Sequence, residues 1–335
     1  MRHAYSYLTR FIPETFAVKT FNFFLSCFEM VSKLVRFIFF GNYFIGILAV
    51  VLTIESTLQL NVPFNSLAYY ALIFSAPIVY YTYAYMGVNK FSIYSNPRAA
   101  WYVKHHRFLS ISQLFLGASA IALFSYLFFR NLQHILHLPL PYWVFVFIIL
   151  GAAALYYGLL PAFFFNLNLR NTGWLKPFII GFIWACTANI LPLILLKIER
   201  GNPFPTDVLW VWLFIKNWMF CTVNAIMFDI KDYAIDANLE LKTFVVRIGI
   251  RKTIFYILLP LLSIGVISLL IFAYVRNFPA IRVGFNLLPF LLTMLVAFSM
   301  HHRQRILYYL IVIDGLIFVK AICGIIGILI APDLI

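Results

Sequence analysis

The stretch "ILYYLIVIDGLIFVKAICGIIGILIA", residues 306–331, has the length and the composition of a membrane span, with charge only at Asp314 and Lys320. A helix rises about 1.5 Å per residue, so a run of about 20 apolar residues crosses the hydrocarbon core of a bilayer. Similar runs recur along the chain, which is 64% apolar and 11% charged. A soluble domain is closer to half apolar. The sequence therefore predicts a polytopic membrane protein.

Nine such spans are expected, and they predict an all-α bundle of nine transmembrane helices around a central cavity that opens to the inner side. Residues 1–36 precede them and are interpreted as an N-terminal interfacial amphipathic segment, or alternatively as an extension of the first span. Residues 37–335 form the transmembrane domain. The expected spans are 37–56, 67–88, 108–129, 142–165, 177–196, 207–228, 253–274, 284–300 and 306–331.

The distribution of positive charge predicts the orientation of the chain in the membrane. With the N-terminus placed inside, most Lys and Arg residues outside the spans fall in inner loops, as in most membrane proteins. This predicts an integral protein of the inner or cytoplasmic membrane with a cytoplasmic N-terminus. The net charge of +14 is then mostly a matter of topology, and we expect neither a nucleic-acid partner nor a protein partner.

A second stretch, "FDIKDYAIDANLELKTFVVRIG" at residues 228–249, concentrates three aspartates in a chain with only 11 acidic residues. On a helix, Asp229, Asp232 and Asp236 fall within about 60° of arc and therefore share one face. Carboxylate oxygens suit Mg²⁺, which typically binds one or two carboxylates together with substrate phosphates. The alternative interpretation is a solvated acidic loop at the membrane surface.

This stretch resembles the second aspartate-rich motif of the UbiA family of intramembrane prenyltransferases. That motif reads D-x-x-D-x-x-x-D, then a Lys/Arg-Thr pair, then an apolar stretch ending in Gly. The matching positions are Asp229, Asp232, Asp236, Lys242, Thr243 and Gly249. The resemblance implies that the three aspartates hold Mg²⁺. It also implies transfer of a prenyl group from an allylic diphosphate to a lipophilic acceptor within the membrane.

The loop after the second expected span departs from the family's pattern. The first family motif, N-D-x-x-D-x-x-x-D, corresponds to "VNKFSIYSNPRAAWYVKHH" at residues 88–106. Asn89 matches, but Lys90, Ile93 and Pro97 stand at the aspartate positions, and Arg98 stands for the Arg that usually follows. The basic residues of this loop either bind phosphate directly or simply follow the positive-inside rule.

Two function classes remain open on these grounds. The first is a prenyltransferase in which Asn89, Lys90, Arg98, Lys242 and Arg247 contact the diphosphate. The second is a non-catalytic, isoprenoid-binding relative or a lipid carrier, which loss of the first aspartate motif favours.

Ionisable residues inside the spans add further candidates, because such residues usually face a cavity or a partner. Lys216 and Asp314 are expected near the middle of the bilayer, either as a structural ion pair or as a site for the acceptor or the diphosphate. Asn224 lies one turn before Asp229 and is expected to line the cavity. Lys320 is expected to extend toward the membrane surface, and Glu55 receives no role.

Overall fold

The computed structural model describes residues 29–86, 96–157, 173–238, 243–301 and 306–332, and every regular element in these ranges is a helix. Six helices are long and apolar enough to cross a membrane, or up to seven if one bent pair is a single span. The expected all-α class and the integral membrane character are thereby confirmed. The six are His106–Arg130, Lys176–Arg200, Leu209–Tyr233, Ile250–Val275, Ala280–Ser299 and Ile306–Ile330.

The nine expected spans are confirmed only in part. Six correspond to these long helices, and the first corresponds to the bent pair Glu29–Phe40 and Tyr43–Gln59, whose axes differ by 68°. The remaining two fall on α4, Leu67–Met86, and on α8, Leu140–Tyr157. The expected continuation of α8 lies outside the described residues, as do residues 1–28 of the N-terminal segment.

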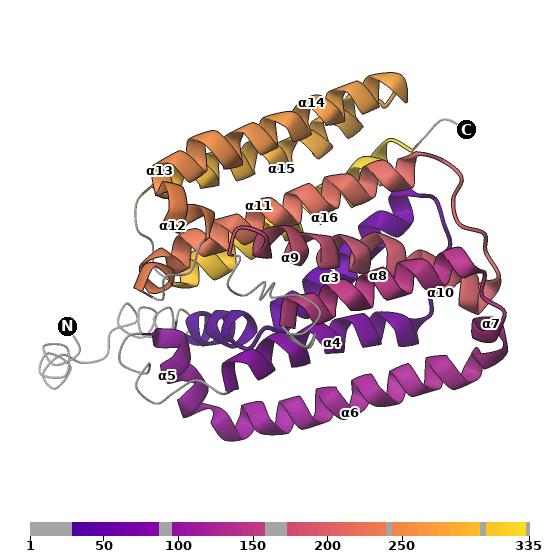
Figure 1. Cartoon of the computed structure of the whole chain (residues 1–335), viewed down its shortest axis with the longest axis horizontal. Coiled ribbons are helices and arrows are strands. Elements are labelled where there is room, and N and C mark those ends of the chain that lie inside the picture. The colour runs from indigo at the N-terminus through magenta and orange to yellow at the C-terminus, as the bar shows by residue number, and fades with distance from the viewer. Residues whose placement is uncertain (1–28, 87–95, 158–172, 239–242, 302–305, 333–335) are drawn as a thin grey trace, which may run out of the picture.

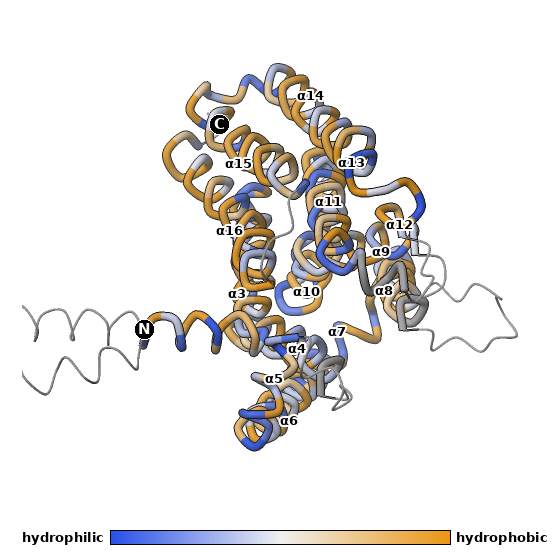
Figure 2. The backbone as a smooth tube through the Cα atoms, turned by 90° about the vertical axis from the view of Figure 1, so that its left-hand side faces the viewer, coloured by the Kyte–Doolittle hydropathy of each residue, from blue (hydrophilic) through white to orange (hydrophobic). Residues whose placement is uncertain are grey.

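The helices run roughly along one axis, and segments distant in sequence lie side by side (Figure 1). Viewed end-on in Figure 2, α14 and α15 lie on one flank, α11, α16 and α3 lie in the middle, and α4 and α6 form the opposite flank. We call the end that carries α5 and α12 the aspartate end, and the end that carries α7 the far end (Figure 1).

The elements are α3 Tyr43–Gln59, α4 Leu67–Met86, α5 Pro97–Lys104, α6 His106–Arg130, α7 Leu132–Leu136, α8 Leu140–Tyr157, α9 Lys176–Ala185, η2 Cys186–Ile190, α10 Leu191–Arg200, α11 Leu209–Asn238, α12 Phe244–Ile248, α13 Ile250–Thr253, η3 Ile254–Leu258, α14 Leu259–Val275, α15 Ala280–Ser299 and α16 Ile306–Ile330.

The break before α3 is held by side chains from a distant helix. Asn42 adopts a left-handed backbone conformation with φ of 63°. Its Oδ1 accepts a hydrogen bond from Arg98 Nη2 at 2.6 Å, and its Nδ2 donates to the Tyr102 hydroxyl at 3.2 Å. Arg98 and Tyr102 also donate to the carbonyl of Phe40, at 3.1 and 3.0 Å. The last two bonds satisfy the Phe40 carbonyl at the break, as an apolar environment requires.

Two wide π-helical turns, η2 and η3, occur where proline follows in an otherwise continuous span. The turn Cys186–Ile190 comes just before Pro192, and the turn Ile254–Leu258 comes just before Pro260. Proline lacks an N–H and clashes with the carbonyl one turn earlier in a regular α-helix. A wider turn relieves that clash locally, so the span continues without a large bend.

The closest helix contact relevant to the site is that of α9 with α11 at Gly181. A Cβ added at Gly181 would lie 2.8 Å from both the Trp218 carbonyl oxygen and the Thr222 backbone nitrogen. Trp218 Nε1 donates to the carbonyl of Phe178 at 2.8 Å and ties the same two helices together. Only glycine permits this approach, because the obstacle is backbone and cannot rotate away.

We expect Gly181→Ala to lower the thermal unfolding temperature of the purified full chain in detergent, since overpacking typically costs about 1–3 kcal/mol. Gly117→Ala is the matched control, because nothing lies within 4 Å of a Cβ at that helical glycine. Its unfolding temperature is expected to stay unchanged or rise slightly. An equal effect of the two substitutions would contradict the assigned contact.

Candidate functional site

The three predicted aspartates all lie on α11 near the aspartate end, as the helical spacing predicted. Asp229 is buried, and its Oδ1 is 3.4 Å from the ammonium of Lys176, the first residue of α9. Asp232 is more exposed and forms an ion pair with Lys231 at 3.1 Å. The side chain of Asp236 lies outside the described residues. Each described carboxylate of the motif therefore faces a lysine.

The donor chemistry of this face suits Mg²⁺ only in part. Asp229 and Asp232 offer hard carboxylate oxygens from adjacent turns of one helix, which is the ligand type that Mg²⁺ prefers. Among the described residues, however, no group of three or more His, Cys, Asp or Glu side chains comes together in a way that could hold a metal ion. A cation held by Asp229 and Asp232 alone would share its coordination with phosphate or water oxygens.

The other predicted contact residues are dispersed. Arg98 is buried at the helix break, where it bonds Asn42 and Phe40, while Arg247 is exposed on α12. Asn224 is buried and donates to the carbonyl of Phe220 in its own helix, at 2.8 Å. Asn89, Lys90 and Lys242 lie outside the described residues. The diphosphate contacts assigned to these residues remain predictions.

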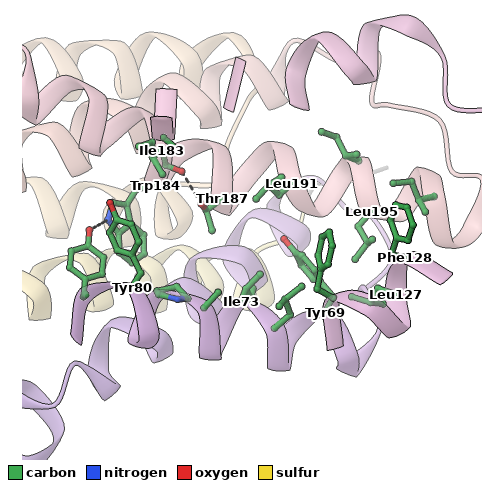
Figure 3. A pocket seen from close by; sticks show the side chains of 18 of the residues that line it. Tyr69, Ile73, Tyr80, Leu127, Phe128, Ile183, Trp184, Thr187, Leu191 and Leu195 are labelled. Carbon is green, nitrogen blue, oxygen red and sulfur yellow. Dashed lines mark hydrogen bonds between the residues drawn. The ribbon is translucent and has the colours of Figure 1, made fainter. Parts of the chain in front are cut away.

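A largely apolar cavity of about 600 Å³ lies between α4 and α6 on one side and α8, α9, η2 and α10 on the other. This is within the usual range for small-molecule sites, about 300–1,000 Å³. Figure 3 shows Tyr80 and Trp184 at one end of the cavity and Leu127, Phe128 and Leu195 at the other. The cavity therefore runs along the bundle, beside its middle layer, and the expected central cavity is not confirmed.

Several polar groups border the half of the cavity nearer the aspartate end, and Tyr69 borders the half nearer the far end (Figure 3). Trp184 Nε1 donates to the Tyr81 hydroxyl at 3.2 Å, and the Thr187 hydroxyl donates to the Ile183 carbonyl at 2.8 Å (Figure 3). Toward the far end, side chains such as Leu127, Ile135 and Ile198 complete the lining. A ligand with one polar end and a hydrocarbon tail can lie in this cavity with its polar end beside Tyr81 and Trp184.

The cavity and the aspartates meet along α9. Ile180 lines the cavity, and Lys176, one helical turn earlier, forms the pair with Asp229. One turn corresponds to a rise of about 5–6 Å. A molecule lying in the cavity can therefore place its polar end near the Lys176–Asp229 pair.

The structure also contains a buried polar network that the sequence did not reveal. Lys320 does not extend to the surface: its ammonium is 2.6 Å from Glu55 Oε2, and both side chains are at most 2% exposed. Gln59 donates to Glu55 Oε1 at 2.8 Å, and Lys320 also donates to Asn217. A side chain at Gly324 would collide with Glu55 and Gln59, so glycine at this position allows α16 to approach α3 closely. The spacing of Glu55 and Gln59, one turn apart on α3, was the available signal.

The network continues to the π-helical turn that borders the cavity. Asn189 Oδ1 accepts from Ser56 at 2.9 Å and from Asn217 at 3.2 Å. Its Nδ2 donates to the carbonyl of Ala185 at 2.9 Å. Asn189 thus faces the network, while Thr187 of the same turn faces the cavity. Every polar group of this side chain is satisfied, as burial in an apolar bundle requires.

The proposed pairing of Lys216 with Asp314 is not formed. Lys216 Nζ donates to Asn286 Oδ1 at 2.7 Å and lies over the Trp212 ring. The two residues lie near opposite ends of antiparallel helices, which places them roughly 15 Å apart along the bundle at 1.5 Å per residue. Asp314 is buried on α16 nearer the aspartate end.

The Glu55–Lys320 pair predicts a distinctive pattern of stability. Glu55→Gln or Lys320→Met alone leaves an uncompensated buried charge and is expected to cost about 3–5 kcal/mol. The double variant removes both charges and is expected to recover most of that loss. Unfolding of all four proteins in detergent, compared as a double-mutant cycle, measures this coupling. Additive losses would show that the two charges do not stabilise each other.

Comparison with family models, with curated proteins and with solved structures finds no significant match for this chain. The resemblance to the prenyltransferase motif therefore rests on the residues of the 228–249 stretch and on the expected topology.

Proposed function

We propose that this protein is an integral membrane prenyltransferase, which transfers a prenyl group from an allylic diphosphate to a lipophilic acceptor. The observation that carries the proposal is the position of the apolar cavity, whose aspartate end lies one helical turn from the Lys176–Asp229 pair. The cavity accommodates a hydrocarbon chain, and the charged face of α11 accommodates the diphosphate. The spacing of the aspartates, Asp229, Asp232 and Asp236, supports the same assignment.

In this reaction the bond between the allylic carbon and the diphosphate oxygen breaks, and its electron pair leaves with diphosphate. The allylic carbon then bonds to a nucleophilic atom of the acceptor, which loses a proton. Lys176 and Lys231 can neutralise charge on the leaving diphosphate, and the aromatic rings of Tyr80, Tyr81 and Trp184 can stabilise positive charge on the prenyl group. Mg²⁺ held by Asp229, Asp232 and Asp236 would supply further neutralisation of the leaving group.

The topology that goes with this proposal has nine spans, a cytoplasmic N-terminus and the aspartate end at the cytoplasmic surface. Basic residues at the aspartate end support this orientation, because positive charge gathers on the cytoplasmic side. They include Lys104, Arg107, Arg247, Arg251 and Lys252.

The second candidate function is a non-catalytic protein that binds or carries an isoprenoid lipid. The pairing of Asp229 with Lys176 and of Asp232 with Lys231 favours it, because these lysines already neutralise the carboxylates. Such a protein would use the same cavity for the hydrocarbon chain. It differs from the enzyme in retaining the diphosphate bond.

The aspartates provide the direct test between the two functions. In membranes containing the full chain, we expect Mg²⁺-dependent release of diphosphate from allylic diphosphates. The rate of release should fall at least tenfold in Asp229→Ala and in Asp232→Ala, because a charge-assisted contact is worth about 1.5–3 kcal/mol. Asp207→Ala is the matched control, because Asp207 pairs with Arg276 at the far end. Retention of a labelled prenyl diphosphate without turnover, across chain lengths and acceptors, would instead support the carrier.

The cavity gives a second, independent prediction. Ala76 lines the cavity midway along α4, so Ala76→Trp is expected to block the path of a long chain. Turnover or binding of long-chain diphosphates should fall at least tenfold, while the shortest allylic diphosphate, which does not reach Ala76, is affected less. Ala122→Trp, at an exposed position of α6 outside the cavity lining, is the control. Equal effects on all chain lengths would contradict this use of the cavity.

A further inference from the structure

A second hollow lies on the opposite flank of the molecule, at the far end, and the proposed reaction does not use it. It is a groove of about 680 Å³ between α11 and α14. Its walls are apolar side chains that face away from the protein, with exposed fractions from 57% to 68%, and they include Val208, Ile264, Ile267, Ile271 and Val275.

The floor of the groove is a rigid aromatic pair. The rings of Trp212 and Phe272 are stacked, with centroids 4.3 Å apart and planes 7° apart. Trp212 Nε1 donates to the Ser268 hydroxyl at 3.2 Å, and the ammonium of Lys216 lies 5.1 Å from the Trp212 ring centroid. These contacts hold Trp212 against α14, so the groove is preformed.

One end of the groove is charged. Arg276, which also lines the groove, follows the last residue of α14, and it forms an ion pair with Asp207, just before α11 begins. The guanidinium lies 5.6 Å from the Phe272 ring centroid. Because both residues stand at the ends of membrane-spanning helices, the pair lies at the level of the lipid headgroups, with one positive and one negative group side by side.

The length of the groove matches one leaflet of a bilayer. From Val275 down to Ile264 the groove follows α14 over a rise of about 16 Å, and the hydrocarbon part of one leaflet is about 15 Å thick. An extended acyl chain can therefore lie along the groove.

We propose that this groove binds a zwitterionic glycerophospholipid of the surrounding leaflet. One acyl chain lies on the Trp212–Phe272 floor, the phosphate contacts Arg276, and the headgroup ammonium contacts Asp207. Water does not fill an apolar groove at this depth, so in the membrane the space is occupied by hydrocarbon. The charged pair at its mouth makes the occupant a phospholipid rather than an uncharged lipid.

The proposal is tested by lipid retention. The purified full chain is partly delipidated, and native mass spectrometry counts the phosphatidylcholine molecules that stay bound. We expect the wild type to retain one phosphatidylcholine in preference to diacylglycerol with the same chains. Ile267→Trp fills the groove and is expected to abolish this retention. Leu270→Trp, also on α14 but outside the groove, is the control and is expected to retain the lipid.

The headgroup contact has its own matched pair of variants. Arg276→Gln should lower phosphatidylcholine retention roughly threefold to tenfold, because it removes a charged contact that is partly exposed. Arg130→Gln is the control, because Arg130 also lies over an aromatic ring at the far end but borders no groove residue. Inorganic phosphate should not compete. Competition by phosphate, or equal losses in the two Arg variants, would overturn the headgroup assignment.

A second readout does not depend on the folding of a groove-filled variant. Phosphatidylcholine with brominated acyl chains should quench the fluorescence of Trp212 in vesicles, measured as the difference between wild type and Trp212→Phe. Lack of quenching would overturn the proposal. A dimer that dissociates in Ile267→Trp would also overturn it, because a second copy of the chain would then occupy the groove.

Discussion

At Gly181 the backbone of α9 lies against the backbone of α11, near the Trp218 carbonyl and the Thr222 amide. Any side chain here would push the two helices apart. The contact brings the first residue of α9, Lys176, to the carboxylate of Asp229 on α11. The adjoining side of α9, with Ile180 and Trp184, lines the apolar cavity. One glycine contact thus couples the charged face and the cavity.

A second constraint is the cost of polar groups in hydrocarbon. Glu55 and Lys320 are fully buried, and each finds a charged partner and at least one further hydrogen bond. The same network reaches Asn189, which sits in the wide turn that precedes Pro192. The turn presents Thr187 to the cavity on its other side. The shape of the cavity wall therefore depends on a polar network that does not border the cavity itself.

The lysines beside the aspartates bear on both candidate functions. Lys176 and Lys231 stand where cations are expected to meet Asp229 and Asp232. In an enzyme, an incoming diphosphate can draw these ammonium groups away and leave the carboxylates to a divalent cation. In a carrier, the same ion pairs keep the charge balanced without a metal. Both uses agree with a chain in which Lys90 stands at a position where the first prenyltransferase motif has a carboxylate.

Hydropathy alone determined that this is a helical membrane protein, because crossing a bilayer demands long apolar runs that few other structures need. Helical spacing also placed Asp229, Asp232 and Asp236 correctly on one helix. The sequence did not show the partners of Lys176, Lys216 and Lys320, nor the position of the cavity. Those depend on which helices meet and at what height, and apolar spans of similar composition do not encode this in any local pattern. Only the packed bundle decided that Lys320 meets Glu55, that Lys216 meets Asn286, and that the cavity lies beside α9, because close contacts between distant segments set those distances.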